Sequence, residues 1–133
     1  IIKKLEILDK TELLVGIFEG ERNANGDEIV QYAYANEYGI GVPKRSFMRS
    51  TCDEKNNWKK EAEQVFNDII DGEKVKKAVN ILGEIIVNDI VDKISSNIPP
   101  PNSPKTLAKK RGSRTLIDTG AMRNAVKYII EMS

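Results

Sequence analysis

The hydrophobic pattern of the chain is clearest between residues 75 and 94. Apolar side chains recur there every three or four residues, which is the spacing of one buried helix face. The pattern predicts a helix of about 25 residues, roughly 37 Å long at 1.5 Å per residue. Three prolines at 99–101 prevent it from continuing. The stripe consists of Val75, Val79, Leu82, Ile86, Ile90 and Ile94.

A second helix is predicted ahead of this one. Apolar residues keep helical spacing over residues 58–70, as expected for an amphipathic helix. Thr51 and Glu54 have the form of a capping box, which places the helix start at Thr51, with Ser46 as an earlier alternative. The sequence therefore favours one continuous helix over about 51–70.

Strand patterns occur nearer the two ends. Residues 13–18 are rich in β-formers, residues 126–132 alternate between the two sides of a strand, and residues 5–8 alternate weakly. A short helix is predicted over residues 28–38, ended by Gly39. Two or three strands with two substantial helices predict an α+β fold: a small antiparallel sheet with two long helices packed on it, and a long extended loop.

Composition places the chain among folded proteins. Its 133 residues are enough for a single domain over 1–133 to bury a core without metal or disulfide support. A content of 40% hydrophobic and 31% charged residues argues against disorder throughout. The single cysteine, Cys52, forms no internal disulfide and fits a reducing compartment. No apolar run is long enough to predict a membrane span.

The absence of histidine lowers the expectation of catalysis. Histidine is the commonest general base near neutral pH and the commonest transition-metal ligand. We therefore predict a protein that is not an enzyme and holds no cofactor or metal, although a carboxylate or lysine mechanism stays open. Asp89 and Asp92 could bind a divalent cation, but their spacing fits the solvated face of an amphipathic helix better.

Positive charge is concentrated in residues 98–115, called here the basic arm. The chain has a formal net charge of +1, and the arm holds 5 basic and no acidic residues, so the remainder carries 1 − 5 = −4. A loop of about 18 residues is usually functional or disordered in a compact domain. We expect a flexible arm that orders against a neighbouring subunit, an acidic surface or DNA phosphate; a solvated loop is the alternative. Its basic residues are Lys105, Lys109, Lys110, Arg111 and Arg114.

Two pairs of segments carry a family resemblance. Residues 34–39 (YANEYG) precede residues 43–49 (PKRSFMR), and residues 104–110 (PKTLAKK) precede residues 116–122 (LIDTGAM). In this order, over roughly residues 30–132, they resemble the tail-completion, or virion morphogenesis, proteins of long-tailed bacteriophages and prophages.

The resemblance implies a structural protein that forms a ring of identical subunits, with a hexamer as one expected size, at the head–tail junction or tail end. Its implied partners are tail-tube or connector proteins, with non-specific DNA contact in the channel as a secondary role. It would be located in the virion and, during assembly, in the host bacterial cytoplasm. The implied interface residues are Arg45, Phe47, Arg49, Lys105, Thr106, Lys109, Lys110, Arg111 and Arg114, and Asp118, Thr119 and Gly120 form a structural turn.

A second hypothesis needs no resemblance. The basic arm by itself is also consistent with a small nucleic-acid-binding module that neutralises backbone phosphates. Such a module would bind DNA with a steep dependence on salt, and this dependence distinguishes it from an assembly subunit.

Overall fold

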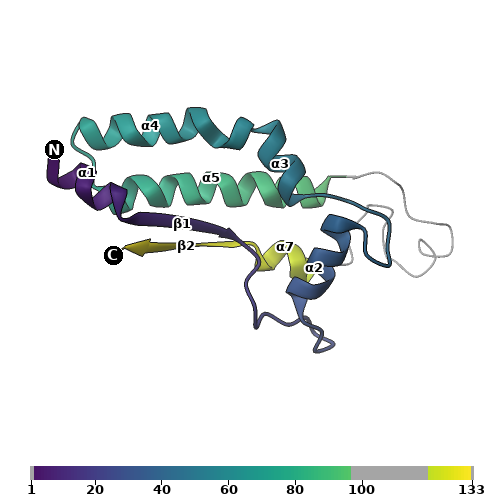
Figure 1. Cartoon of the computed structure of the whole chain (residues 1–133). Coiled ribbons are helices and arrows are strands. Elements are labelled where there is room, and N and C mark those ends of the chain that lie inside the picture. The colour runs from purple at the N-terminus through teal and green to yellow at the C-terminus, as the bar shows by residue number, and fades with distance from the viewer. Residues whose placement is uncertain (1, 97–119, 133) are drawn as a thin grey trace.

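The fold mixes helices with a small antiparallel sheet (Figure 1). The computed structural model describes residues 2–96 and 120–132, so the basic arm lies outside the described residues. Within that part of the chain there are six α-helices, a short 3-10 helix and two strands. In chain order the elements are α1 (Ile2–Asp9), β1 (Thr11–Gly16), α2 (Ile29–Tyr38), α3 (Met48–Glu54), η1 (Asn56–Trp58), α4 (Lys59–Ile70), α5 (Val75–Ser95), α7 (Gly120–Ala125) and β2 (Lys127–Met132).

The sheet joins two segments predicted as strands: residues 13–18, rich in β-formers, and the alternating residues 126–132. Strands β1 and β2 run antiparallel, with Leu13 opposite Ile130 and Leu14 opposite Ile129. Leu13 and Ile130 pack on the core, whereas Leu14 and Ile129 point outward. This alternation buries one face and exposes the other, as the period of two requires.

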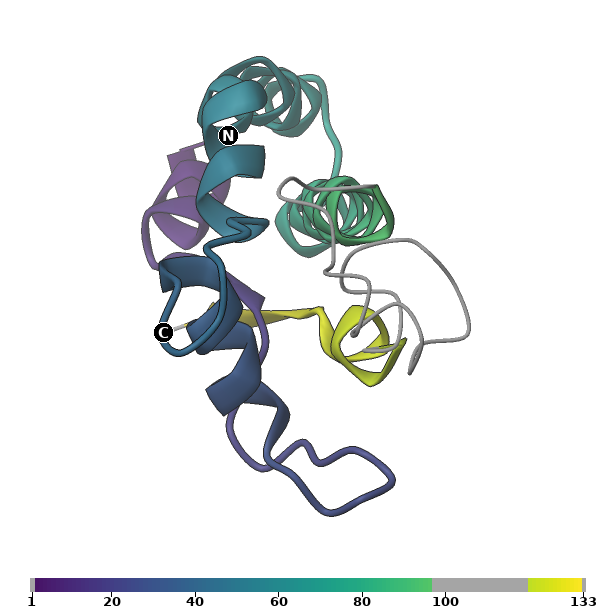
Figure 2. The ribbon, with the colours of Figure 1, turned by 90° about the vertical axis from the view of Figure 1, so that its right-hand side faces the viewer.

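Helix α5 is the element that both core clusters share. It contacts both strands on one side and α4 on another, and the three layers are visible from the end of the molecule (Figure 2). Helix α4 packs chiefly on α5, so the expected packing of both long helices on the sheet is not confirmed. The buried positions of α5 are Val75, Ala78, Val79, Gly83, Ile86, Ile90 and Ile94.

Two clusters of buried side chains meet along α5. The larger one gathers residues from α2, α3, α7 and the second half of α5, with Phe47 and Met122 at 2% and 0% exposed. The smaller one joins α4 to the first half of α5 and includes Ile69, which is 0% exposed. The α2–α3 region is therefore anchored on the same helix that supports the sheet.

A glycine in α5 lets the sheet approach closely. A Cβ on Gly83 would lie 2.6–2.9 Å from three ring carbons of Tyr128 on β2, which is closer than side-chain carbons pack. The Tyr128 hydroxyl donates to Asn80 Oδ1 at 3.1 Å, so the ring is held at both ends. Glycine is otherwise unfavourable inside a helix, and its place here is explained by this contact.

The N-terminal segment is helical, although residues 5–8 alternate weakly. Leu8 packs against the smaller core cluster. The ammonium group of Lys4 donates to the carbonyl oxygens of Gly72 and Glu73 at 2.8 and 3.3 Å. Tertiary contacts, which a local pattern does not contain, favour the helix here.

The predicted continuous helix over residues 51–70 is interrupted. Asn56, Asn57 and Trp58 have φ of 49°, 55° and 55° and form a left-handed turn between α3 and α4. Asparagine adopts this region readily, whereas a bulky residue such as tryptophan rarely does. Thr51 does not cap a helix start: it is 1% exposed inside α3, and its hydroxyl donates to the Phe47 carbonyl oxygen.

Trp58 is fixed in this turn by α5. Its side chain is buried, and the indole Nε1 donates to Asp89 Oδ2 at 2.8 Å. Lys55 Nζ lies 4.0 Å from the other carboxylate oxygen of Asp89. The solvated-face interpretation was therefore wrong for Asp89, which joins the turn to α5.

Replacing Asp89 with alanine is expected to destabilise the chain by about 1–2 kcal/mol, because the buried indole N–H loses its acceptor. Urea unfolding followed by the fluorescence of Trp58, the single tryptophan, measures this. Asp92→Ala is the control, since Asp92 is exposed on the same helix and should give a change below about 0.5 kcal/mol. Equal effects of the two substitutions would contradict the role given to Asp89.

Candidate functional site: the α2–α3 unit

The first two motif segments form one structural unit, residues 29–54, called here the α2–α3 unit. Helix α2 ends at Gly39, whose φ of 73° is left-handed and whose N–H donates to the Ala35 carbonyl oxygen. A Cβ on Gly39 would lie 2.9 Å from the Cβ of Lys44. Glycine is therefore required both for its backbone conformation and for the tight return of the loop.

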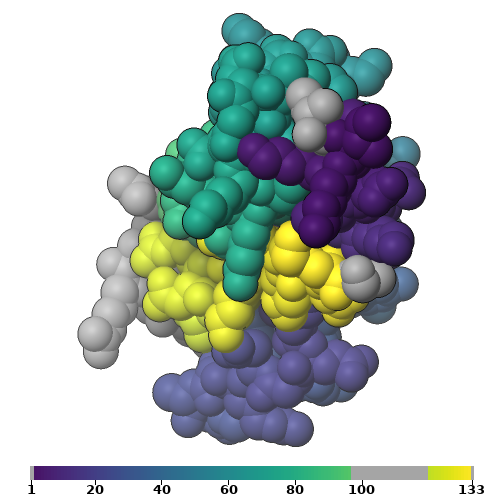
Figure 3. All heavy atoms as spheres, turned by 90° about the vertical axis from the view of Figure 1, so that its left-hand side faces the viewer, coloured from purple at the N-terminus to yellow at the C-terminus, as the bar shows by residue number. Residues whose placement is uncertain are grey.

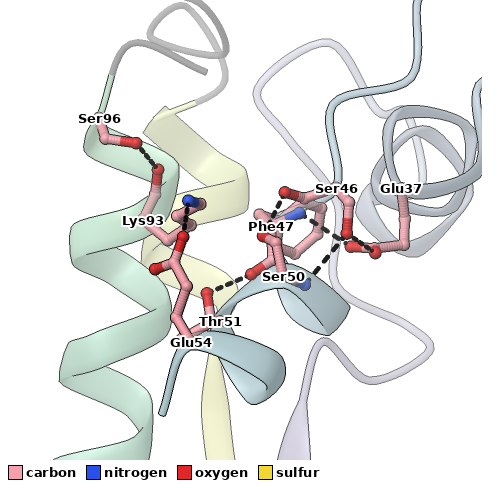
Figure 4. Close-up of polar contacts among 8 residues, drawn as sticks. All are labelled: Glu37, Ser46, Phe47, Ser50, Thr51, Glu54, Lys93 and Ser96. Carbon is pink, nitrogen blue, oxygen red and sulfur yellow. Dashed lines mark hydrogen bonds and ion pairs between the residues drawn. The ribbon is translucent and has the colours of Figure 1, made fainter. Parts of the chain in front are cut away.

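The loop brings the start of α3 onto Glu37. The Glu37 side chain is 8% exposed, and its carboxylate accepts hydrogen bonds from the backbone N–H groups of Phe47, Met48 and Arg49 at 3.0, 2.7 and 3.3 Å. The Ser46 hydroxyl donates to the same carboxylate, and Figure 4 shows this group between the two helices.

Glu37 therefore caps α3 from another helix. The first N–H groups of a helix have no partner inside it, and a carboxylate there also faces the positive end of the helix dipole. Ser46 adds a second cap from the residues just before α3, because its Oγ accepts a hydrogen bond from the Ser50 N–H at 3.2 Å. The glutamate of one motif segment and the backbone of the next are thus one hydrogen-bonded group.

The predicted interface residues of this loop lie in different environments. Phe47 is 2% exposed and belongs to the larger core cluster. Arg45 is 7% exposed, and its backbone N–H donates to the Asn36 carbonyl oxygen at 2.8 Å. Arg49 is exposed. Of the three, Arg49 is therefore the side chain that reaches the surface freely, while Phe47 holds the unit on the core.

Two hollows flank Tyr38 and Met48. One, of about 500 Å³, is lined on its far side by Arg49, Cys52 and Asp53. The other, of about 190 Å³, is lined mainly by apolar side chains of α2 and α3. Glu37 lines both hollows, so the residue whose carboxylate caps α3 is also part of their walls.

Exposed apolar side chains extend from α2 into the following loop. They are Tyr34, Tyr38, Ile40 and Val42, with exposures of 56%, 59%, 56% and 42%, and they are called here the tyrosine patch. The two tyrosine rings are 4.7 Å apart and tilted by 48°. Large exposed apolar side chains that lie close together in the chain are a candidate contact site for another protein.

Cys52 is not poised for thiolate chemistry. Burial raises the pKa of the Cys52 thiol, the negative charges of Asp53 and Glu37 raise it further, and a backbone hydrogen bond lowers it. The thiolate is the nucleophilic form, and a raised pKa leaves less of it at neutral pH.

Alkylation of Cys52 by iodoacetamide should therefore have a pH–rate profile with a higher apparent pKa in the folded chain than in urea. The apparent pKa reports how readily the thiolate forms. Access of iodoacetamide to the sulfur changes only the limiting alkylation rate at high pH, so the two effects are separated. A folded profile that coincides with the unfolded one, or lies below it, would contradict the proposed effect of burial and of the two carboxylates.

The remaining predicted site residues fall mostly outside the described part of the chain. Gly120, the last residue of the predicted Asp118-Thr119-Gly120 turn, is the first residue of α7. The others, Lys105, Thr106, Lys109, Lys110, Arg111, Arg114, Asp118 and Thr119, lie outside the described residues.

Residues 2–96 and 120–132 contain neither a cluster suited to a metal ion nor a membrane-spanning helix. No group of three or more Cys, Asp or Glu side chains is arranged there to hold a metal ion. Helices in the same ranges are all too short or too polar to cross a membrane.

Comparison with known proteins identified no relative of this chain. A scan against protein-family models and searches of curated proteins and of solved structures found no match.

Proposed function

We propose that this chain is a structural, non-enzymatic subunit that works by binding other protein subunits, and that its specific role is phage or prophage tail completion. The observation that carries the proposal is the tyrosine patch. Its apolar side chains project from the α2–α3 unit, which is built from the first pair of segments that resemble the tail-completion family. An exposed apolar patch on a rigid base is typical of a protein–protein contact.

The specific role adds partners and a location. Identical subunits would close into a ring through heterologous contacts, and the ring would bind the tail tube or the connector in the virion after assembly in the bacterial cytoplasm. Arg49 lies at the edge of the larger hollow beside Tyr38, where a charged residue at the rim of an interface favours orientation and encounter.

Sedimentation velocity and negative-stain electron microscopy test the proposal, using the protein alone and mixed with phage tail-tube and connector proteins. We expect rings or capped tubes. The double variant Tyr34→Ser/Tyr38→Ser should remain folded, because both rings are exposed, and should lose binding. Phe66→Ser is the matched control, since Phe66 is an exposed aromatic residue on α4. A wild-type chain that stays monomeric and binds neither partner would refute the proposal.

A second candidate is the nucleic-acid-binding module, favoured by the 5 basic and 0 acidic residues of the arm. It predicts retardation of DNA that weakens steeply with salt, because each neutralised phosphate releases counterions. Lys109→Ala/Lys110→Ala/Arg111→Ala should abolish that binding. Wild-type protein that leaves DNA mobility unchanged at low salt would end this candidate.

A further inference from the structure

The face of the sheet that points away from α5 carries three cross-strand pairs, one of which is Gly16 opposite Lys127. Leu14 is opposite Ile129, and these side chains are 39% and 43% exposed. Two positions along, Glu12 is opposite Glu131, and both are exposed. The latter two pairs are called here the outer sheet face. The β2 strand (yellow) lies open at the surface beside α1 (purple) in Figure 3.

The glutamate pair is unfavourable in the isolated chain. Like charges directly opposite each other on a sheet are destabilising. The side-chain carboxylates of Glu12 and Glu131 form no hydrogen bond or ion pair with residues 2–96 or 120–132, whereas the ammonium group of Lys127 on β2 is bound to Glu21. The outer sheet face therefore presents an uncompensated double negative charge beside an apolar pair.

A symmetric contact between two such faces would place four carboxylates together, so the charge disfavours a two-fold partner and favours a basic one. The same chain contains a segment of that chemistry. The basic arm holds Lys105, Lys109, Lys110, Arg111 and Arg114 with no acidic residue, and Leu107 lies among them. Complementary surfaces on one chain generate a heterologous contact, the kind that closes into rings.

We propose that the outer sheet face binds the basic arm of a neighbouring copy. This inference rests on the proposed function, an assembly of identical subunits, and adds which surfaces meet. Basic side chains of the arm neutralise Glu12 and Glu131, and apolar side chains cover Leu14 and Ile129. The tyrosine patch, which belongs to α2 and the following loop, stays available for the tail tube or connector.

Helix α5 offers a competing acidic surface. Ile81 and Ile85 are 47% and 36% exposed, and Glu84 and Asp92 are exposed beside them. On this helix the two carboxylates are eight residues apart, which is about 12 Å of helix rise, so they do not oppose each other as Glu12 and Glu131 do. The opposed carboxylates of Glu12 and Glu131 therefore gain more from a cationic partner than those on α5. For this reason we assign the binding of the basic arm to the outer sheet face.

Charge-swap variants test the assignment by sedimentation velocity at low salt. The face variant Glu12→Lys/Glu131→Lys and the arm variant Lys109→Glu/Lys110→Glu/Arg111→Glu should each associate about tenfold or more weakly than wild type. Their mixture should recover association, because each variant then supplies the charge that the other lacks. The face variant still has two like charges opposite each other, so we expect its folding stability to equal that of wild type.

The variant Glu6→Lys/Glu63→Lys is the control, since it makes the same change in net charge at exposed positions on α1 and α4. It should associate as wild type does. Wild-type association that both swaps leave unchanged would overturn the assigned surfaces while leaving the ring proposal standing. A wild-type chain that never associates would overturn both.

Cross-linking identifies the surface directly. A carbodiimide joins carboxylates to lysine amines, and mixing ¹⁴N-labelled with ¹⁵N-labelled protein marks links between copies by mass. We expect mixed-isotope links from Glu12 or Glu131 to lysines of the basic arm. Links that instead join the arm to Glu84 or Asp92, or that form only within one copy, would overturn the proposal.

Discussion

Replacing Glu37 with alanine is expected to destabilise the folded chain by about 3 kcal/mol or more. Three backbone N–H groups at the start of α3 donate to this carboxylate, and hydrogen bonds to a charged acceptor contribute roughly 1.5–3 kcal/mol each. Those donors would stay next to the core without partners, because Phe47 anchors α3 there. Chemical denaturation followed by circular dichroism gives the change in unfolding free energy.

Two comparisons show whether the effect comes from capping. Glu37→Gln keeps an acceptor oxygen and removes the charge, so its effect should be about half that of alanine. Glu63→Ala removes an exposed glutamate of α4 and should change the unfolding free energy by less than about 0.5 kcal/mol. An alanine effect at Glu37 no larger than that at Glu63 would rule out the cap.

Replacing Gly83 with alanine is expected to destabilise the chain by a net amount of about 1–2 kcal/mol. The new methyl group would meet the Tyr128 ring at 2.6–2.9 Å, and overpacking of this kind typically costs about 1–3 kcal/mol. That cost exceeds the gain of about 1 kcal/mol that alanine brings to a helix interior. The ring has little freedom to move, since its hydroxyl is bonded to Asn80. Urea unfolding measures the loss.

A double-variant cycle isolates the contact between helix and strand. In a Tyr128→Ala background the clash is absent, so Gly83→Ala should become neutral or stabilising by up to about 1 kcal/mol. Gly120→Ala is a positional control, because a Cβ built there has no heavy atom of the described residues within 4 Å, apart from its chain neighbours and the backbone of its own helix. If Gly83→Ala destabilises equally in both backgrounds, Tyr128 is not the reason for the glycine.

Local patterns predicted the elements whose stability comes from one repeating face. The stripe over residues 75–94 became α5, and the segments 13–18 and 126–132 became β1 and β2. Gly39 ended α2 as its position indicated. These succeeded because the period of apolar residues and the conformational preference of glycine are properties of short segments.

The left-handed turn before α4 could not be predicted in this way. Asn56 and Asn57 tolerate the left-handed conformation but do not require it, and the partner of the Trp58 indole, Asp89, lies thirty-one positions away. The N-terminal helix depends in the same way on contacts with the α4–α5 turn. Distant partners override local propensity at both places.

The candidate site was predicted in part. Its two segments were identified together by resemblance, but which residues face outward was not. Phe47 points into the core, while Tyr34 and Tyr38 are exposed. A single sequence shows residue types, whereas the direction of Phe47 depends on Glu37 holding the start of α3 from another helix.

The register of the sheet also has a mechanical consequence. Thr11 is paired with Met132, so the chain enters β1 and leaves β2 at the same end of the sheet, as Figure 1 shows. A pull on the two flanking segments would load the backbone hydrogen bonds one pair at a time, from Thr11 toward Gly16, instead of all together. Such a sheet separates pair by pair at low force. We expect the contact of Tyr128 with Gly83, near the Gly16 end of the sheet, to resist this separation most.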